Sequence, residues 1–136
     1  MKYMILAHGS QQDYDSFSGE DDTRPSASAD ELAAIGEFLT RFTGDLVASG
    51  ELVDTQGLSA PVLAREVVLR GGVPVVTDGP FAETEEVVAG YWIVDCASFD
   101  RATEIAVRLS QAPGRPADAG VVIRPLMGSE NDIDDI

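Results

Sequence analysis

Short apolar runs alternate along the chain with two longer segments in which apolar residues recur every three or four positions. Runs rich in β-prone residues predict strands, and the wider spacing predicts amphipathic helices. The runs lie at 1–7, 51–58, 62–70, 73–76, 87–95 and 120–126, and the helical segments begin at residues 29 and 99. The pattern therefore predicts a chain of mixed helices and strands, with each helix connecting two strands.

Both predicted helices have start signals in the sequence. Ser28 precedes Glu31 by three residues, the spacing of a capping box, and Ser98 can cap the second helix. Gly50 follows the last apolar position of the first helix, predicted at 29–49, where a left-handed residue often ends a helix. The predicted core-facing residues are Leu32, Ile35, Phe38, Leu39, Phe42 and Leu46 in the first helix, and Phe99, Ala102, Ile105, Ala106 and Leu109 in the second.

The strand pattern predicts a sheet with apolar groups on both faces. Residues 3–7 are all apolar although successive side chains point to opposite faces, and the same holds for the neighbours Tyr91 and Trp92. Gly71-Gly72 between two β-prone runs predicts a two-residue hairpin. The order of elements resembles an α+β domain of the ferredoxin-like type with an inserted β-hairpin.

Two helices can cover only one face of such a sheet. The apolar groups of the other face need a second layer, and another copy of the chain can supply it by packing sheet against sheet about a two-fold axis. We therefore expect a homodimer. The alternative is a monomer whose hairpin folds over the sheet.

The length of 136 residues suits a single domain with a core of ordinary size. We place this domain at residues 1–127. Residues 11–27 are polar and acidic, and we expect them to form a mobile loop that could act as a lid. Residues 128–136 form an acidic tail that we expect to fray.

The charge of the chain argues against several classes of partner. Asp and Glu outnumber Lys and Arg by 24 to 9, which gives a net charge of −15. This charge opposes binding to nucleic acid or to an anionic membrane. The lone cysteine, Cys96, excludes an internal disulfide and should be buried. Because no signal peptide or long apolar segment is evident, we expect a cytoplasmic protein.

Two of the predicted strands are connected by a stiff polar loop. The loop reads Asp-Gly-Pro-Phe-Ala-Glu-Thr-Glu-Glu at 78–86 and is followed by Gly90-Tyr91. Gly79 can adopt a positive φ and Pro80 fixes its own φ, so Asp78 begins a rigid turn. This run is similar to the DGPF signature of the YCII-related family of small bacterial proteins. The similarity extends to residues 1–6, to the hairpin and to residues 122–126.

The resemblance covers most of the chain outside residues 11–27 and the last ten. It departs from the family pattern at Glu85, where a lysine is frequent, and at Ala89, where a glycine is. It implies a dimeric α+β barrel with a cleft in each protomer rather than a particular reaction. We predict no cofactor. Some relatives are thought to use a His-Asp pair with the histidine on the first helix. The segment 29–49 contains no histidine, so that pair cannot be transferred.

Six residues are candidates for a site if a pocket lies between the sheet and the signature loop. His8, the only histidine, and Asp78 could form a general-base pair in a small-molecule lyase or isomerase. Arg124 could hold an anionic substrate through a bidentate contact. The other ligand-binding candidates are Glu83, Glu86 and Tyr91.

A non-catalytic explanation of the same residues is the one we expect. Asp78 would cap the turn, and Glu83 or Glu86 would pair with Arg124 or with the partner protomer. The protein would then be a small-molecule-binding or regulatory module. The resemblance to proteins often encoded beside extracytoplasmic-function sigma factors implies a link to stress signalling. A manganese or magnesium site at His8, Glu83 and Glu86 is a weaker third explanation, and we predict no metal.

Overall fold

A four-stranded antiparallel sheet forms the centre of the fold. The structure, a computed structural model, describes residues 1–18, 28–115 and 119–128. The strands of the sheet are β1 (Lys2–Gly9), β2 (Leu52–Gly57), β5 (Val87–Asp95) and β6 (Val121–Pro125). Their order is β2-β5-β1-β6, and each neighbouring pair is antiparallel. The chain is thus an α+β protein, compatible with the predicted ferredoxin-like class.

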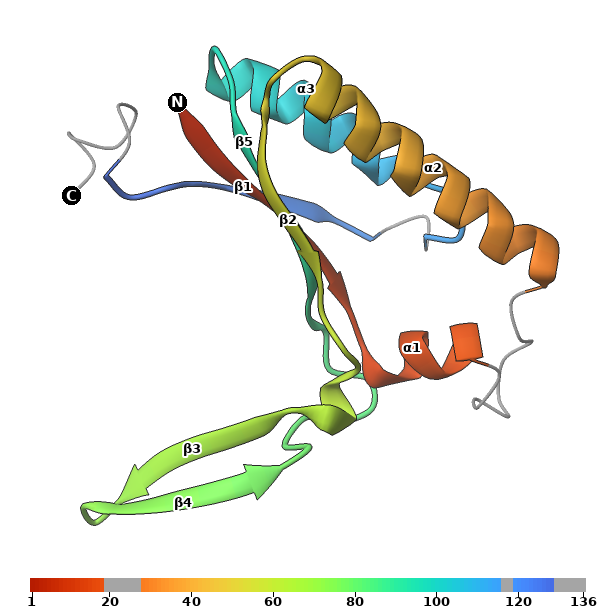
Figure 1. The fold of residues 1–136 in the computed structure, drawn as a ribbon. Helices are drawn as coiled ribbons and strands as arrows, with labels where there is room; N and C mark the ends of the chain where they lie inside the picture. The colour runs from red at the N-terminus through yellow and green to blue at the C-terminus, as the bar shows by residue number, and fades with distance from the viewer. Residues whose placement is uncertain (19–27, 116–118, 129–136) are drawn as a thin grey trace.

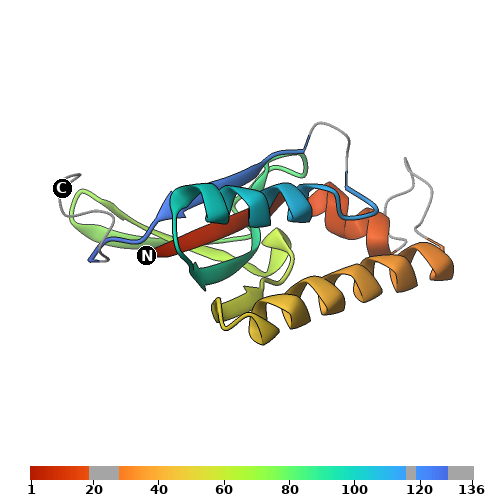
Figure 2. The same ribbon diagram turned by 90° about the horizontal axis from the view of Figure 1, so that it is seen from above.

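Two long helices cover one face of the sheet (Figure 1; Figure 2). They are α2 (Ala29–Ala48) and α3 (Phe99–Ser110). The predicted caps are confirmed: Ser28 Oγ accepts the Glu31 N–H at 3.1 Å, and Ser98 Oγ accepts the Arg101 N–H at 3.0 Å. Gly50 follows α2 with φ +77°, as predicted for a left-handed C-terminal residue. None of the helices in the described part of the chain is long and apolar enough to span a membrane.

The core lies between the sheet and these helices. Trp92 packs edge-on against Phe42, with ring centroids 5.4 Å apart. Tyr91 points to the other face, as predicted, where its hydroxyl donates to Asp54 Oδ2 at 2.9 Å. Cys96 is buried, also as predicted. The buried apolar residues are Tyr3, Ile5, Phe42, Leu46, Val94, Cys96, Ala102, Ile105, Ala106 and Leu109.

A short helix, α1 (Gln11–Ser18), replaces the first part of the predicted mobile loop. The prediction was wrong for these residues because it overlooked a capping box. The Ser10 N–H donates to Asp13 Oδ2 at 2.8 Å, and the Asp13 N–H donates to Ser10 Oγ at 3.2 Å. The rest of the predicted loop, 19–27, lies outside the described residues, as does nearly all of the predicted tail.

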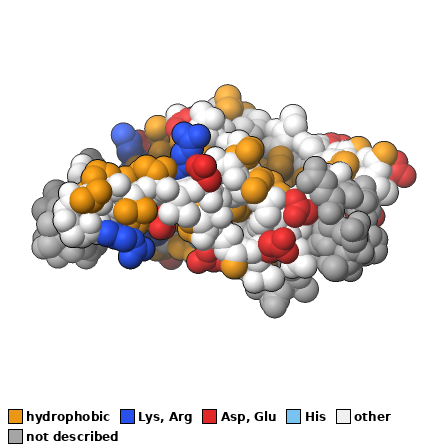
Figure 3. Space-filling view, turned by 90° about the horizontal axis from the view of Figure 1, so that it is seen from below, with side chains coloured by type: hydrophobic (Ala, Val, Ile, Leu, Met, Phe, Trp, Pro, Cys, Tyr) orange, Lys and Arg blue, Asp and Glu red, His pale blue; other side chains and the backbone are white. Residues whose placement is uncertain are grey.

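A separate two-stranded sheet projects away from the main sheet (Figure 1). It consists of β3 (Arg65–Arg70) and β4 (Val73–Asp78), which follow a 3-10 turn, η1 (Pro61–Leu63). Gly71 and Gly72 join the two strands with φ +58° and +81°, as expected for the predicted two-residue turn. Apolar side chains gather over this hairpin in Figure 3, and Lys or Arg side chains lie beside them. The hairpin therefore presents an apolar surface to the outside.

Candidate functional site

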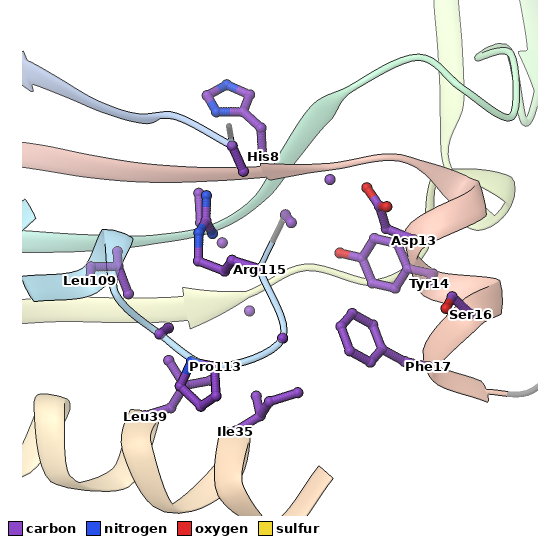
Figure 4. Close-up of a pocket in the computed structure, with 18 of the residues that line it drawn as sticks. His8, Asp13, Tyr14, Ser16, Phe17, Ile35, Leu39, Leu109, Pro113 and Arg115 are labelled. Carbon is purple, nitrogen blue, oxygen red and sulfur yellow. The ribbon is translucent and has the colours of Figure 1, made fainter. Parts of the chain in front are cut away.

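A cavity of about 520 Å³ lies on the helix-covered face of the sheet (Figure 4). Its walls come from β1, β2, β5, α1, α2 and the loop that follows α3. Trp92, Thr55 and Ala7 are contributed by the sheet. Volumes of this order are typical of sites for small organic molecules.

One wall of the cavity is α1, which contributes Tyr14 and Phe17. The Tyr14 hydroxyl donates to the Leu58 carbonyl at 2.8 Å, which attaches the helix to the end of β2. A tyrosine phenol keeps its proton at neutral pH, and burial raises the pKa of Tyr14 further. The aromatic wall is therefore held in place by a contact distant in sequence.

The opposite wall is formed by α2 and by the loop after α3. Ile35 and Leu39 of α2 face Pro113 and Gly114 of the loop. Gly114 has φ +79°, and a Cβ there would lie only 2.7 Å from Ile35 Cδ1. The positive φ favours glycine, because another residue would be strained there, and a Cβ would also require the Ile35 side chain to shift. The close approach of this loop helps to enclose the cavity.

Arg115 brings a half-buried guanidinium to the cavity. Its Nη2 donates to the Gly120 carbonyl at 3.1 Å. Its Nε is buried and has no hydrogen-bond partner within the described residues. In Figure 4 the guanidinium lies inside the cavity, with Asp13 and Tyr14 across from it. Glu31 also lines the cavity, but its side chain is exposed.

Two of the six predicted site residues, His8 and Glu86, line this cavity. The imidazole of His8, however, lies on the other side of β1 from Ile35 and Leu39 (Figure 4). Glu86 is exposed at the end of the signature loop. His8 is thus at the edge of the site with its ring directed away from the apolar interior.

Asp78 and Glu83 are not part of the cavity lining. Asp78 Oδ1 accepts from Arg65 Nε at 2.8 Å, and both side chains are largely exposed, at 77% and 75%. This pair joins β4 to β3 at the base of the hairpin. Glu83 is exposed, and its carbonyl accepts the Gln12 N–H at 2.9 Å. The structure therefore does not bring His8 and Asp78 together at the cavity.

Tyr91 and Arg124 lie on other parts of the sheet. The Tyr91–Asp54 hydrogen bond is on the face opposite the helices, and it is the main reason why the pKa of Tyr91 is raised. Arg124 is exposed on β6, paired in register with Met4. The described residues contain no group of three His, Cys, Asp or Glu side chains suited to a metal ion.

The signature loop and the hairpin base instead hold α1 in position. Gly79 has φ +54°, its N–H donates to the Ala64 carbonyl at 2.8 Å, and a Cβ at this position would lie 3.2 Å from the Val62 carbonyl oxygen. The Val62 N–H donates to Gln11 Oε1 at 2.8 Å. Together with the Gln12 bond to the signature loop, these contacts fix the first turn of α1 beside the cavity.

The sequence analysis missed the residues that shape this site most directly. Tyr14 and Phe17 are three positions apart and follow the Ser10-x-x-Asp13 capping pattern, so a local helix signal was present. Arg115 is the only basic residue in the loop 112–119. Its position as the single basic residue among Pro, Gly, Ala and one Asp was the available signal, although it could not show which way the side chain points.

The fold and the cavity define an α+β domain that carries a site of ligand size under its helical layer. The YCII-related domain family matches residues 1–122 of this chain. The chain is also 31% identical over 126 residues to an uncharacterized protein of Rhizobium meliloti (strain 1021), a match that covers 93% of this chain and 92% of that protein. The chain belongs to the YCII-related domain family.

Proposed function

We propose that this protein is a homodimeric binding module that takes a small organic molecule into the cavity bounded by α1, α2 and the loop after α3. The observation that supports this function best is the cavity itself, of about 520 Å³. Concave pockets of this size, lined mainly by apolar side chains with a few polar groups, are the usual binding sites of small organic molecules. A bound molecule would fill space that the side chains leave open.

A regulatory role would fit a binding module of this kind. A ligand in the cavity would touch Tyr14 and Phe17 of α1, and α1 contacts the hairpin base through Gln11 and the signature loop through Gln12. A change in the position of α1 on ligand binding would thus be passed on to the exposed apolar hairpin. The link to sigma-factor stress signalling rests on the family resemblance, and the hairpin is the surface where we would look for a partner.

The alternative function, a lyase or isomerase with a His/Asp general base, needs both groups beside one substrate. His8 lines the cavity, whereas Asp78 pairs with Arg65 on the hairpin. We therefore rank this alternative below the binding function.

The homodimer is supported by the sheet face opposite the helices. Its strands alternate between core residues and outward apolar residues, as in β1, where Ile5 is fully buried and its neighbours Met4 and Leu6 point the other way. Val122 of β6 lies in register with Leu6 and is 45% exposed. A second copy of the same face would cover these groups.

The binding function is tested by a substitution on the sheet that fills the cavity with a larger side chain. In Ala7→Phe, a benzyl group would project from β1 toward α2, while Val107→Phe adds the same group to the exposed side of α3. We expect a library of small aromatic acids, amides and amines to contain molecules that raise the melting temperature of the wild type and of Val107→Phe but not of Ala7→Phe. Equal shifts in all three proteins would contradict binding in this cavity.

A further inference from the structure

Arg115 presents to the cavity a guanidinium that has few hydrogen-bond partners in the described part of the chain. Its Nε is buried without a hydrogen-bond partner in the described residues, and only its Nη2 has a recorded bond, to Gly120. A buried donor without a partner is unfavourable, and more so when the group is charged. The Nε itself is enclosed by protein, but the guanidinium faces the cavity (Figure 4), and a molecule there can pair with its charge through the Nη groups.

An anionic group is the best partner for this guanidinium. Guanidinium binds carboxylates through short, parallel, charge-assisted hydrogen bonds. The exposed carboxylates of Glu31 and Glu86, together with Asp13, also line the cavity. Their presence disfavours an anion of high charge, such as a phosphate dianion, more strongly than a single carboxylate paired directly with Arg115.

The apolar part of the cavity lining indicates what the ligand carries besides its anionic group. Phe17, Ile35, Leu39 and Trp92 present apolar surface to the cavity. An apolar or aromatic body would bury itself against these side chains, and a fully polar molecule would leave them facing water.

From these observations we propose that the cavity binds a small organic monocarboxylate with an apolar body, and that Arg115 holds the carboxylate. The inference rests on the proposed binding function and specifies the ligand class for the same site. Arg115 acts here as a binding residue, and no chemical step is implied.

Three probes of nearly equal shape test the proposal: 3-phenylpropanoate, 3-phenylpropanamide and 3-phenylpropylamine, with inorganic phosphate as a fourth. Binding is followed by chemical-shift titration of the full chain. We expect the wild type to bind the carboxylate at least about tenfold more tightly than the amide, which corresponds to one good charge-assisted contact. The amine and phosphate should bind more weakly still.

Arg115→Gln should remove the preference for the carboxylate and leave amide binding unchanged. Arg41→Gln, at an exposed arginine of α2 that is not part of the cavity lining, serves as the matched control and should behave like the wild type. If Arg115→Gln does not fold, Arg115→Lys retains the charge without the planar fork and should lower the carboxylate preference severalfold.

The outcomes separate the two proposals. If the carboxylate and the amide bind the wild type equally tightly, and Ala7→Phe binds neither, the assignment of Arg115 is overturned while the binding function stands. Carboxylate binding that Ala7→Phe does not affect would contradict the cavity as the site. Failure of all the probes to bind the wild type, or tightest binding of phosphate, would overturn the carboxylate assignment.

Discussion

Among the cationic side chains of the described residues, Arg101 makes the most hydrogen bonds to carboxylates. Its Nε and Nη2 donate to the two carboxylate oxygens of Glu51 at 3.0 and 2.9 Å, and its Nη1 donates to Glu104 at 3.1 Å. These bonds raise the pKa of Arg101 further, and the bond from Arg101 is the main cause of the lowered pKa of Glu51. Because Glu51 precedes β2 and Arg101 lies in α3, the pair connects two elements fifty residues apart in sequence.

Arg101→Gln should lower the free energy of unfolding by about 1–2 kcal/mol, because Glu51 is left half-paired while the solvent exposure of Arg101 limits the loss. Arg41→Gln removes an exposed pair with Glu37 in α2 and should cost less than about 0.5 kcal/mol. Urea denaturation followed by circular dichroism measures both. Equal losses in the two variants would mean that the bidentate geometry contributes nothing.

The Glu51–Arg101 pair also predicts a pH dependence. The pKa of Glu51 is lower in the folded protein than the unfolded value of about 4.3. The contribution of the ionised Glu51 to the free energy of unfolding is therefore fully present above that unfolded value, and it is lost as the pH falls through the folded pKa. The stability difference between wild type and Glu51→Gln should therefore be largest near neutral pH and shrink between about pH 5 and about pH 3. Urea midpoints at several pH values measure it, and a constant difference would contradict the assignment.

Asp78 and Gly79, adjacent in the signature, should respond very differently to substitution. The Asp78–Arg65 pair is exposed, so Asp78→Ala should cost less than about 1 kcal/mol. Gly79→Ala places a Cβ in a left-handed conformation and against the Val62 carbonyl, and should cost about 1–3 kcal/mol. Thermal unfolding of both variants tests the structural role of the turn. A larger loss for Asp78→Ala would show that the carboxylate has a contact beyond Arg65.

The helices and strands were largely predictable because their signals are local. The serine caps of α2 and α3, the glycine after α2 and the Gly71-Gly72 turn each depend on a few adjacent residues. The helix α1 was predictable in principle from the Ser10-x-x-Asp13 spacing, but the acidic composition of residues 11–27 suggested a loop instead. Here a local cap outweighed composition.

The candidate site was much less predictable because it depends on contacts between distant segments. His8 and Asp78 both lie near strand ends, yet nothing in the sequence shows that one lines the cavity and the other pairs with Arg65. Arg115 reaches the cavity because Gly114 lets its loop approach Ile35 of α2. Such an approach is a property of the folded chain and has no signature in the spacing of residues.

The chain combines a high negative charge with apolar areas that are exposed on its described residues. The net charge of −15 opposes the approach of two copies, whereas the exposed hairpin and the sheet face opposite the helices favour it. The side chains of Val67, Leu69 and Val73 on the hairpin are each more than 60% exposed, at 64%, 68% and 62%. Burial of such groups is the main source of free energy for association.

These opposing terms predict a homodimer that salt strengthens. We expect light scattering after size-exclusion chromatography to give twice the mass of one chain, with dissociation on dilution more pronounced at about 0.02 M than at about 0.5 M salt, where charge repulsion is screened. Val122→Glu places a charge on the open sheet face and should yield monomers. Val107→Glu on α3, of similar exposure at 52% against 45%, should remain dimeric. Monomers of wild type at every concentration and salt level would contradict the dimer. Dissociation by both variants would show that added charge, rather than this face, controls association.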